Sequence, residues 1–146
     1  MTRAGGDMYL DSAIIVKLLV REPDSAWFNE HLVGHPFEAS ELALSEVRSA
    51  LLAKERVGEI SKRERAAAAE KFVSMIEEEL IELLPLNRRV LDRASAMQLA
   101  CHPRVPLRTL DALHLATADL HKCEILSSTD SRMRAACEQF AIALFP

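Results

Sequence analysis

The most continuous apolar segment covers residues 107–120, where apolar side chains occupy nearly every face of a helical wheel. A surface helix keeps one polar face, so this pattern predicts a central helix that is buried on all sides. Pro106 precedes the segment, and Thr109 is its candidate N-cap residue. Asp111 would then lie in the first turn, among backbone N–H groups without a partner in the helix. The pattern therefore places a carboxylate at the edge of the hydrophobic core.

Other segments with apolar residues at helical spacing predict six further helices. These helices cover residues 13–20, 22–32, 42–57, 61–78, 88–101 and 131–139. Short apolar runs bounded by turn residues predict strands. These strands cover residues 8–10, 37–40, 81–84 and 125–127, with a C-terminal edge strand within 141–145. Alternating strands and helices predict an α/β fold, a three-layer sandwich with a short, mostly parallel central sheet flanked by helices.

The longest of these helices carries a clear start signal. Ser61 and Glu64 have the spacing of a capping box. Phe72, Val73 and Ile76 are expected to face inward, with the charged residues of this helix on a solvated face. Residues 1–7 show no periodicity and contain two of the four glycines. We therefore expect a flexible extension over residues 1–7 and a single domain over residues 8–146.

The composition agrees with one domain that has its own core. The chain has 146 residues, of which 49% are hydrophobic. No apolar run approaches the length of a membrane span, and residues 1–7 lack the apolar stretch of a signal peptide. Its three cysteines do not form a Cys-x-x-Cys motif and are expected to be small core residues. We expect a cytoplasmic protein without a membrane partner.

Charge is unevenly distributed along the chain. Residues 1–84 carry 10 Lys and Arg against 16 Asp and Glu, and residues 85–146 carry 8 against 6. The net charge of −4 argues against indiscriminate binding to nucleic acid. The C-terminal part is nevertheless rich in arginine, the side chain suited to forked phosphate contacts, and the alternative is a solvated basic surface. Its arginines are Arg88, Arg89, Arg93, Arg104, Arg108, Arg132 and Arg134.

Four acidic residues occupy unusual positions in this pattern. Asp11 and Asp130 follow predicted strands, Asp111 begins the central helix, and Glu46 lies on a helical face of small apolar residues. Each has a structural alternative, such as an N-cap role for Asp11 or a favourable helix-dipole position for Asp111. Glu46 either meets a cation or lies on a face that is less buried than its neighbours suggest.

In a parallel sheet, these four positions can reach the same edge. Carboxylates gathered there become favourable around divalent cations, and a site built only from oxygen ligands selects Mg²⁺ or Mn²⁺ over zinc. Such an ion can lower the pKa of bound water and neutralise charge on a phosphodiester. The pattern thus predicts a metal-dependent hydrolase.

The four acids lie in short motifs that occur in order along the chain. These motifs are Tyr9-Leu10-Asp11-Ser12-Ala13 followed by Lys17 and Glu22-Pro23, then Ser45-Glu46-Val47, then Leu110-Asp111-Ala112-Leu113-His114-Leu115-Ala116-Thr117-Ala118, and finally Ser128-Thr129-Asp130. With them the chain resembles the PIN-domain family, and in particular the VapC toxins of bacterial toxin-antitoxin pairs. The resemblance spans nearly all of residues 8–146. Ser128 stands where such proteins often carry threonine, a change that keeps the hydroxyl group.

This resemblance implies that Asp11, Glu46, Asp111 and Asp130 are the metal-binding and catalytic acids. It implies an endoribonuclease that depends on Mg²⁺ or Mn²⁺, cleaves an RNA substrate, is restrained by a cognate antitoxin and forms a homodimer. We further expect an antitoxin segment to cover an apolar groove and to place a basic side chain beside the acids. That groove is expected near Leu18, Trp27, Leu51 and Leu52.

Other chemistries fit the sequence less well. Asp111 and His114 have the spacing of one di-iron ligand pair, but such sites need a second pair. His102, His114 and His121 with Cys101 or Cys123 match no usual zinc spacing, and a serine nucleophile lacks its Gly-x-Ser-x-Gly elbow. His114 is better interpreted as a hydrogen-bonded core histidine.

Two alternative functions share the same fold. One is a PIN-like nuclease of RNA processing that has no antitoxin. The other is a non-catalytic scaffold that binds RNA or protein, since a fold alone does not establish a function. The four acids argue against the second alternative. The RNA that is cut and the arginines that contact it are left open by the sequence.

Overall fold

The central sheet is short and entirely parallel. In the computed structural model, which describes residues 8–32 and 34–146, its strands lie in the order β3-β2-β1-β4-β5. The strands are β1 (Met8–Leu10), β2 (Phe37–Ser40), β3 (Ile81–Leu84), β4 (Ile125–Ser127) and β5 (Ala143–Phe145). The expected extension, residues 1–7, lies outside the described residues. The predicted three-layer α/β sandwich is confirmed, and β5 is the edge strand expected at the C-terminal end.

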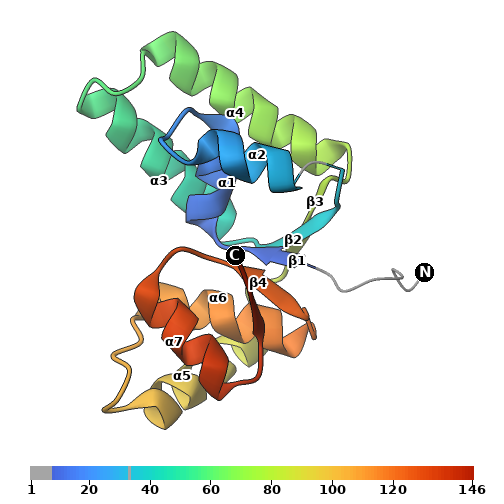
Figure 1. Ribbon diagram of the computed structural model, residues 1–146, viewed down its shortest axis with the longest axis vertical. Coiled ribbons are helices and arrows are strands. Elements are labelled where there is room, and N and C mark those ends of the chain that lie inside the picture. The colour runs from blue at the N-terminus through green and yellow to red at the C-terminus, as the bar shows by residue number, and fades with distance from the viewer. Residues whose placement is uncertain (1–7, 33) are drawn as a thin grey trace.

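Helices cover both faces of this sheet (Figure 1). Helices α1 (Ser12–Leu19), α2 (Ser25–Leu32), α3 (Ala43–Arg56) and α4 (Lys62–Glu77) form one layer. Helices α5 (Arg88–Cys101), α6 (Thr109–Leu120) and α7 (Ser131–Gln139) form the other. Each layer has its own hydrophobic core against the sheet. Side chains alternate between the faces of a strand, so Tyr9 belongs to the core under α5 to α7 and Leu10 to the core under α1 to α4.

The central helix predicted from the sequence is α6. Seven consecutive residues, from Ala112 to Ala118, are buried, and α6 packs against α5, α7 and β2. The predicted cap is wrong by one residue. Arg108 is the N-cap residue, because the chain is still extended there and Thr109 already has helical geometry. Asp111 lies in the first turn as expected.

Several local signals were interpreted correctly, and two were not. The capping box of Ser61 and Glu64 is present in full at the start of α4. Val73, expected inside, is exposed, because Phe72 already occupies the inward position of that turn. Helix α2 begins at Ser25 and not at residue 22. The Ser25 hydroxyl accepts from the Glu22 amide and donates to the Val20 carbonyl, which holds the preceding residues in a turn.

Two further expectations concern the whole chain. All three cysteines are buried, as predicted for small core residues, and the Cys123 thiol donates to Glu38 Oε2 (3.0 Å). Among the residues described here, none of the helices has the length and apolar character needed to cross a bilayer.

The strand order decides where a site can form. From β1 the chain passes through β2 and β3 on one side, and it then returns to β4 and β5 on the other side. Open parallel sheets bind ligands in the crevice outside the carboxyl ends of the strands where this reversal occurs. Here the reversal lies between β1 and β4, the two strands that Asp11 and Asp130 follow.

Candidate active site

Asp11 connects the central strand to the first helix. Its backbone amide donates to the Ser127 carbonyl (3.2 Å), and its Oδ1 accepts from the Ile14 amide (3.0 Å) as the N-cap of α1. Only 5% of this residue is exposed. Burial raises the pKa of the Asp11 carboxyl, opposed by hydrogen bonds from Ser128 and Ile14, whereas the nearby Asp130 charge adds to the rise. The capping role proposed as an alternative is therefore real, and it coexists with a buried carboxylate at the strand end.

Asp130 has the same arrangement at the end of β4. It is the N-cap of α7, with Oδ1 accepting from the Met133 amide (2.9 Å). The Ser128 hydroxyl accepts from the Asp130 amide (3.0 Å) and bonds to the Asp11 carboxylate. Ser128 is fully buried. One serine thus ties together the two loops that carry Asp11 and Asp130.

Asp111 and Asp130 face a common cation, the guanidinium group of Arg108. Arg108 Nε lies 3.4 Å from Asp111 Oδ2, and its Nη2 lies 3.9 Å from Asp130 Oδ2. The Arg108 side chain is 66% exposed, and ion pairs of this kind are weak. These two carboxylates therefore attract positive charge without holding the arginine firmly.

Glu46 lies in the first turn of α3. Its hydrogen-bond partners explain how an acid is accommodated on a face of small apolar residues. Its Oε1 accepts from the Ser12 hydroxyl (2.8 Å) and lies 2.5 Å from His114 Nε2. His114 Nδ1 in turn lies 2.6 Å from the Tyr9 hydroxyl. Burial alone would raise the pKa of Glu46, but the hydrogen bond from His114 and its electrostatic effect, together with the Ser12 hydroxyl, lower that pKa. Glu46 therefore meets a histidine at the edge of the core.

The structure brings the four predicted acids to one edge of the sheet through a chain of contacts. Asp11 is linked to Asp130 through Ser128, and Asp130 is linked to Asp111 through Arg108. Glu46 is bonded to Ser12 beside Asp11 and to His114 one helical turn beyond Asp111. Within residues 8–32 and 34–146, no three His, Cys, Asp or Glu side chains already form a metal-ligand group. The acids are therefore connected through the side chains between them, and Asp111 and Asp130 share the cation of Arg108.

The chemistry of this region fits a hard divalent cation. The four acids supply only oxygen atoms, which suit Mg²⁺ or Mn²⁺. The Arg108 guanidinium between Asp111 and Asp130 already shows that the acids attract a cation there. Sequence reasoning assigned no separate role to Tyr9 or Ser12, which lie beside these acids. It interpreted His114 as a core histidine. The signal that could have revealed the histidine was its position one turn after Asp111 on a helix that is otherwise apolar.

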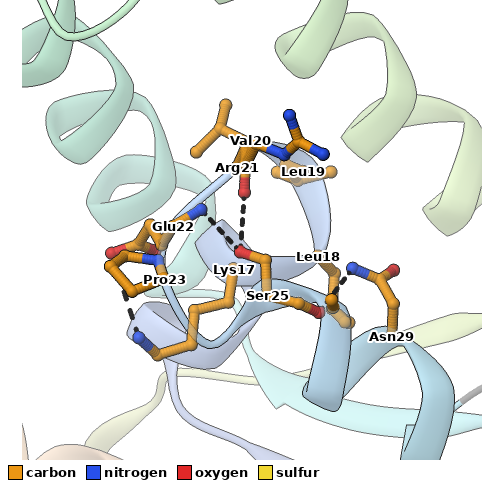
Figure 2. A pocket seen from close by; sticks show the side chains of 10 residues that line it. Lys17, Leu18, Leu19, Val20, Arg21, Glu22, Pro23, Ser25 and Asn29 are labelled. Atoms are coloured by element: carbon orange, nitrogen blue, oxygen red, sulfur yellow. Dashed lines mark hydrogen bonds and ion pairs between the residues drawn. The ribbon is translucent and has the colours of Figure 1, made fainter.

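A hollow in the described surface lies away from these acids. Figure 2 shows it, about 660 Å³, between the end of α1, the turn after it and the start of α2. An adjoining hollow of about 370 Å³ shares Leu18 and Asn29 with it and continues to α4. Together they form a groove, named here the α1/α2/α4 groove. It is lined in part by Leu18, Ala26, Leu32, Phe37, Met75 and Leu80.

This groove corrects the one predicted from the sequence. Leu18 does line it, as expected. Leu51 is buried in the core beneath α3, and Leu52 and Trp27 are not among the lining residues. Trp27 instead stacks on Phe145 of β5, with ring centroids 5.6 Å apart. Helical spacing identifies an apolar face, but it does not say which residues of that face the rest of the fold covers.

With this fold and site, comparison with known proteins identifies the class. The family model of the PIN domain matches residues 8–139. The chain belongs to the PIN-domain family. It is 39% identical to Ribonuclease VapC46 of Mycobacterium tuberculosis over 141 residues, which cover 94% of this chain and 95% of that protein.

Solved structures share the same fold at low sequence identity. M. tuberculosis VapC20, described as a sarcin-ricin loop cleaving toxin, superposes with a TM-score of 0.68 at 17% identity, covering 89% of this chain and 95% of that chain. FitAcB from Neisseria gonorrhoeae has a TM-score of 0.67 at 16% identity, covering 95% and 96%. VapBC2 from Rickettsia felis, bound to a promoter DNA fragment, has a TM-score of 0.67 at 14% identity, covering 94% and 97%.

The position of Arg108 gives a testable prediction. If its guanidinium competes with a divalent ion for Asp111 and Asp130, Arg108→Gln should tighten Mn²⁺ binding by roughly two- to five-fold, as expected for loss of an exposed ion pair. Calorimetric titration with Mn²⁺ at low ionic strength measures this change. Arg104→Gln removes the same charge from an exposed position in the loop before α6 and serves as the control. Unchanged or weaker Mn²⁺ binding in Arg108→Gln would contradict the competition.

Proposed function

We propose that this protein is an endoribonuclease that depends on Mg²⁺ or Mn²⁺ and acts as the toxin of a toxin-antitoxin pair. The observation that carries this proposal is the gathering of Asp11, Glu46, Asp111 and Asp130 at the switch point of the sheet. The proposal is also supported by the 39% sequence identity to Ribonuclease VapC46 across nearly the whole of both chains. We expect the protein to act in the cytoplasm, where its RNA substrate is found.

In this proposal the four acids hold the divalent ion. When bound, the ion supplies positive charge to a phosphodiester and lowers the pKa of water. Asp11 and Asp130 each use Oδ1 to cap a helix, and Asp130 Oδ2 faces the exposed Arg108 guanidinium, which a metal ion would replace. The capping bonds also fix the direction of both carboxylates, so little side-chain freedom is lost when a ligand binds.

Arginines beside the acids suit the phosphates of RNA. Arg108 is largely exposed, and Arg132 is exposed in the first turn of α7. Arg134 bonds to the Ser128 and Pro146 carbonyls, so it supports the β4–α7 loop as well. We assign to Arg108 and Arg132 the contacts with the RNA backbone, because forked guanidinium groups match phosphate oxygens.

The antitoxin would occupy the α1/α2/α4 groove. The solved relatives of similar fold include complexes with antitoxins, such as a toxin-antitoxin complex from Klebsiella pneumoniae (TM-score 0.61, 16% identity, covering 88% of this chain and 91% of that chain). The groove has apolar side chains together with Lys71 in its lining, which suits the apolar face of an amphipathic helix with acidic residues beside that face. A basic side chain from the same partner would compete with a metal ion at the acids, as we predict for Arg108.

The alternative functions lead to different observations. A nuclease of RNA processing would lack a short upstream reading frame for a small DNA-binding protein, whereas a toxin would have one. A non-catalytic scaffold would be inert on every RNA with either metal.

The central prediction concerns the four acids. Purified protein should cleave single-stranded or looped RNA only with Mg²⁺ or Mn²⁺, and a chelator should stop the cleavage. The variants Asp11→Asn, Asp111→Asn, Asp130→Asn and Glu46→Gln should each lower the rate at least roughly 100-fold, since even outer-shell losses at metal sites typically cost 10- to 100-fold. Asparagine caps helices about as well as aspartate, so the folds of the Asp11 and Asp130 variants should survive.

Circular dichroism checks that each acid variant is folded. The metal-nuclease proposal fails if folded Asp111→Asn and Asp130→Asn cut at the parent rate, or if the parent cuts in excess chelator.

The second prediction concerns the antitoxin. The protein encoded directly upstream, co-expressed with this chain, should form a stable complex that lowers both nuclease rate and Mn²⁺ affinity. Leu80→Glu should weaken the complex roughly tenfold or more, because binding would bury an unpaired carboxylate. Leu99→Glu on α5, where the leucine is 77% exposed, makes the same change away from the groove and should have no effect. If the Leu80 and Leu99 variants bind the upstream-encoded protein with equal affinity, this groove is not the antitoxin-binding site.

The third prediction is a homodimer, the commonest symmetric oligomer. Large apolar side chains are exposed in the first turns of three helices, Leu44 in α3, Leu91 in α5 and Leu110 in α6. Light scattering at micromolar concentration should give the mass of two chains, and Leu91→Glu should shift the mass toward one. Val57→Glu, at the other end of α3, is the control. A parent protein that is monomeric at this concentration contradicts the prediction.

A further inference from the structure

A buried chain of hydrogen bonds leads from the central strand to one of the acids. It begins at the Tyr9 hydroxyl, 2.6 Å from His114 Nδ1, and ends at Glu46 Oε1, 2.5 Å from His114 Nε2. Tyr9 is fully buried, and His114 is 3% exposed. The Tyr9 ring meets the His114 ring edge to face, with centroids 5.9 Å apart. Neither side chain can therefore reorient without disturbing the core.

The direction of these bonds follows from the donors available. A tyrosine hydroxyl carries one proton, whereas a neutral imidazole has one donor and one acceptor nitrogen. The Tyr9 oxygen accepts from the backbone amide of Ser40, so its own proton is directed to His114 Nδ1. Nδ1 is then the acceptor, and Nε2 carries the proton that it donates to Glu46. Tyr9 thereby selects the tautomer of His114 that can hold a carboxylate.

The last bond joins the two helical layers. Glu46 belongs to α3, which packs on one face of the sheet, whereas His114 belongs to α6, which packs on the other. Their contact crosses the carboxyl edge of the sheet. Because Asp111 lies one helical turn before His114, the same bond sets the spacing between Glu46 and Asp111.

The bond also orients the Glu46 carboxylate. Both hydrogen bonds, from Ser12 Oγ and from His114 Nε2, end on Oε1. Oε2 is thereby left to face a ligand, and the two donors prevent rotation of the group. Such partners behind a metal-binding carboxylate commonly fix its orientation.

We infer that Tyr9 and His114 are positioning residues. Tyr9 orients His114, and His114 bonds to Glu46 Oε1 so that Oε2 faces the divalent ion. This inference rests on the proposed function, because it assigns these residues a role at the proposed metal site. They act through Glu46 and need no contact with the ion or the RNA. The same two residues also join the central strand to both acid-bearing helices.

Metal binding tests the inference directly. Tyr9→Phe and His114→Leu should weaken the binding of Mn²⁺, measured by calorimetry, roughly 10- to 100-fold, the usual cost of losing an outer-shell partner. His114→Gln keeps an N–H donor for Glu46 and should lose less affinity than His114→Leu. In RNA cleavage, the Mn²⁺ concentration for half-maximal rate should rise more than the maximal rate falls.

A matched control separates positioning from a general loss of buried polar contacts. Thr117 lies on the same helix, is fully buried and donates its hydroxyl to the Leu113 carbonyl (2.7 Å). Thr117→Val removes one buried hydroxyl, as Tyr9→Phe does, without touching Glu46. It should bind Mn²⁺ as the parent does. If Thr117→Val and Tyr9→Phe lose the same affinity, or if folded His114→Leu loses none, the inference is overturned.

Nuclear magnetic resonance tests the hydrogen-bond chain without metal or RNA. In protein labelled with ¹⁵N-histidine, one of the five histidines should show an unprotonated Nδ1 and a protonated Nε2, and its signals should vanish in His114→Gln. Tyr9→Phe should shift its Nδ1 resonance. A doubly protonated ring, or one unaffected by Tyr9→Phe, would contradict the inference. If the parent binds no Mn²⁺ while these signals are as expected, the proposed function fails and the hydrogen-bond chain stands as structure alone.

Discussion

The burial of β1 is the constraint on which the rest of this structure depends. This strand lies in the middle of the sheet, hydrogen-bonded to β2 and β4, and Tyr9 and Leu10 fill opposite cores with no exposed surface. Both faces of the strand are therefore buried, and both edges are hydrogen-bonded to neighbouring strands. The one part of β1 that can face a ligand is its carboxyl end, where the strand order reverses and a crevice forms. Asp11 is the residue at that end.

Helix capping and the proposed metal binding involve the same residues. Asp11 and Asp130 each satisfy a backbone amide at a helix start, a contribution to stability of about 1 kcal/mol at such positions. The capping bond occupies one oxygen of each carboxylate, and the other oxygen of Asp130 faces Arg108. The structural and functional interpretations of these acids are therefore compatible, since the cap orients the group that would meet a cation. Burial still raises the pKa of Asp11, which is the cost of keeping a carboxylate in this crevice.

The two helical layers contribute different parts of the site. The first layer supplies Glu46 and Ser12, and the second supplies Asp111 and His114. They meet where the sheet ends, through the bond between Glu46 and His114. The α1/α2/α4 groove is lined by the first layer and by the start of β2, without a residue of the second layer. Partner binding in that groove and chemistry at the acids would therefore occupy separate surfaces of one domain, connected through α1, which begins beside Asp11 and ends at the groove.

The sequence by itself determined the elements of this fold, because capping, turn and periodicity signals act over only a few residues. It identified α6 as the central helix, the capping box of Ser61 and Glu64, and the short strands that end at Asp11 and Asp130. Tertiary structure decided how these elements meet. The partner of Glu46 is His114, 68 residues away, and the exposure of Val73 and the stacking of Trp27 on Phe145 depend on which surfaces the fold covers. Periodicity shows which face of a helix is apolar, but only the order of the strands sets what lies against that face.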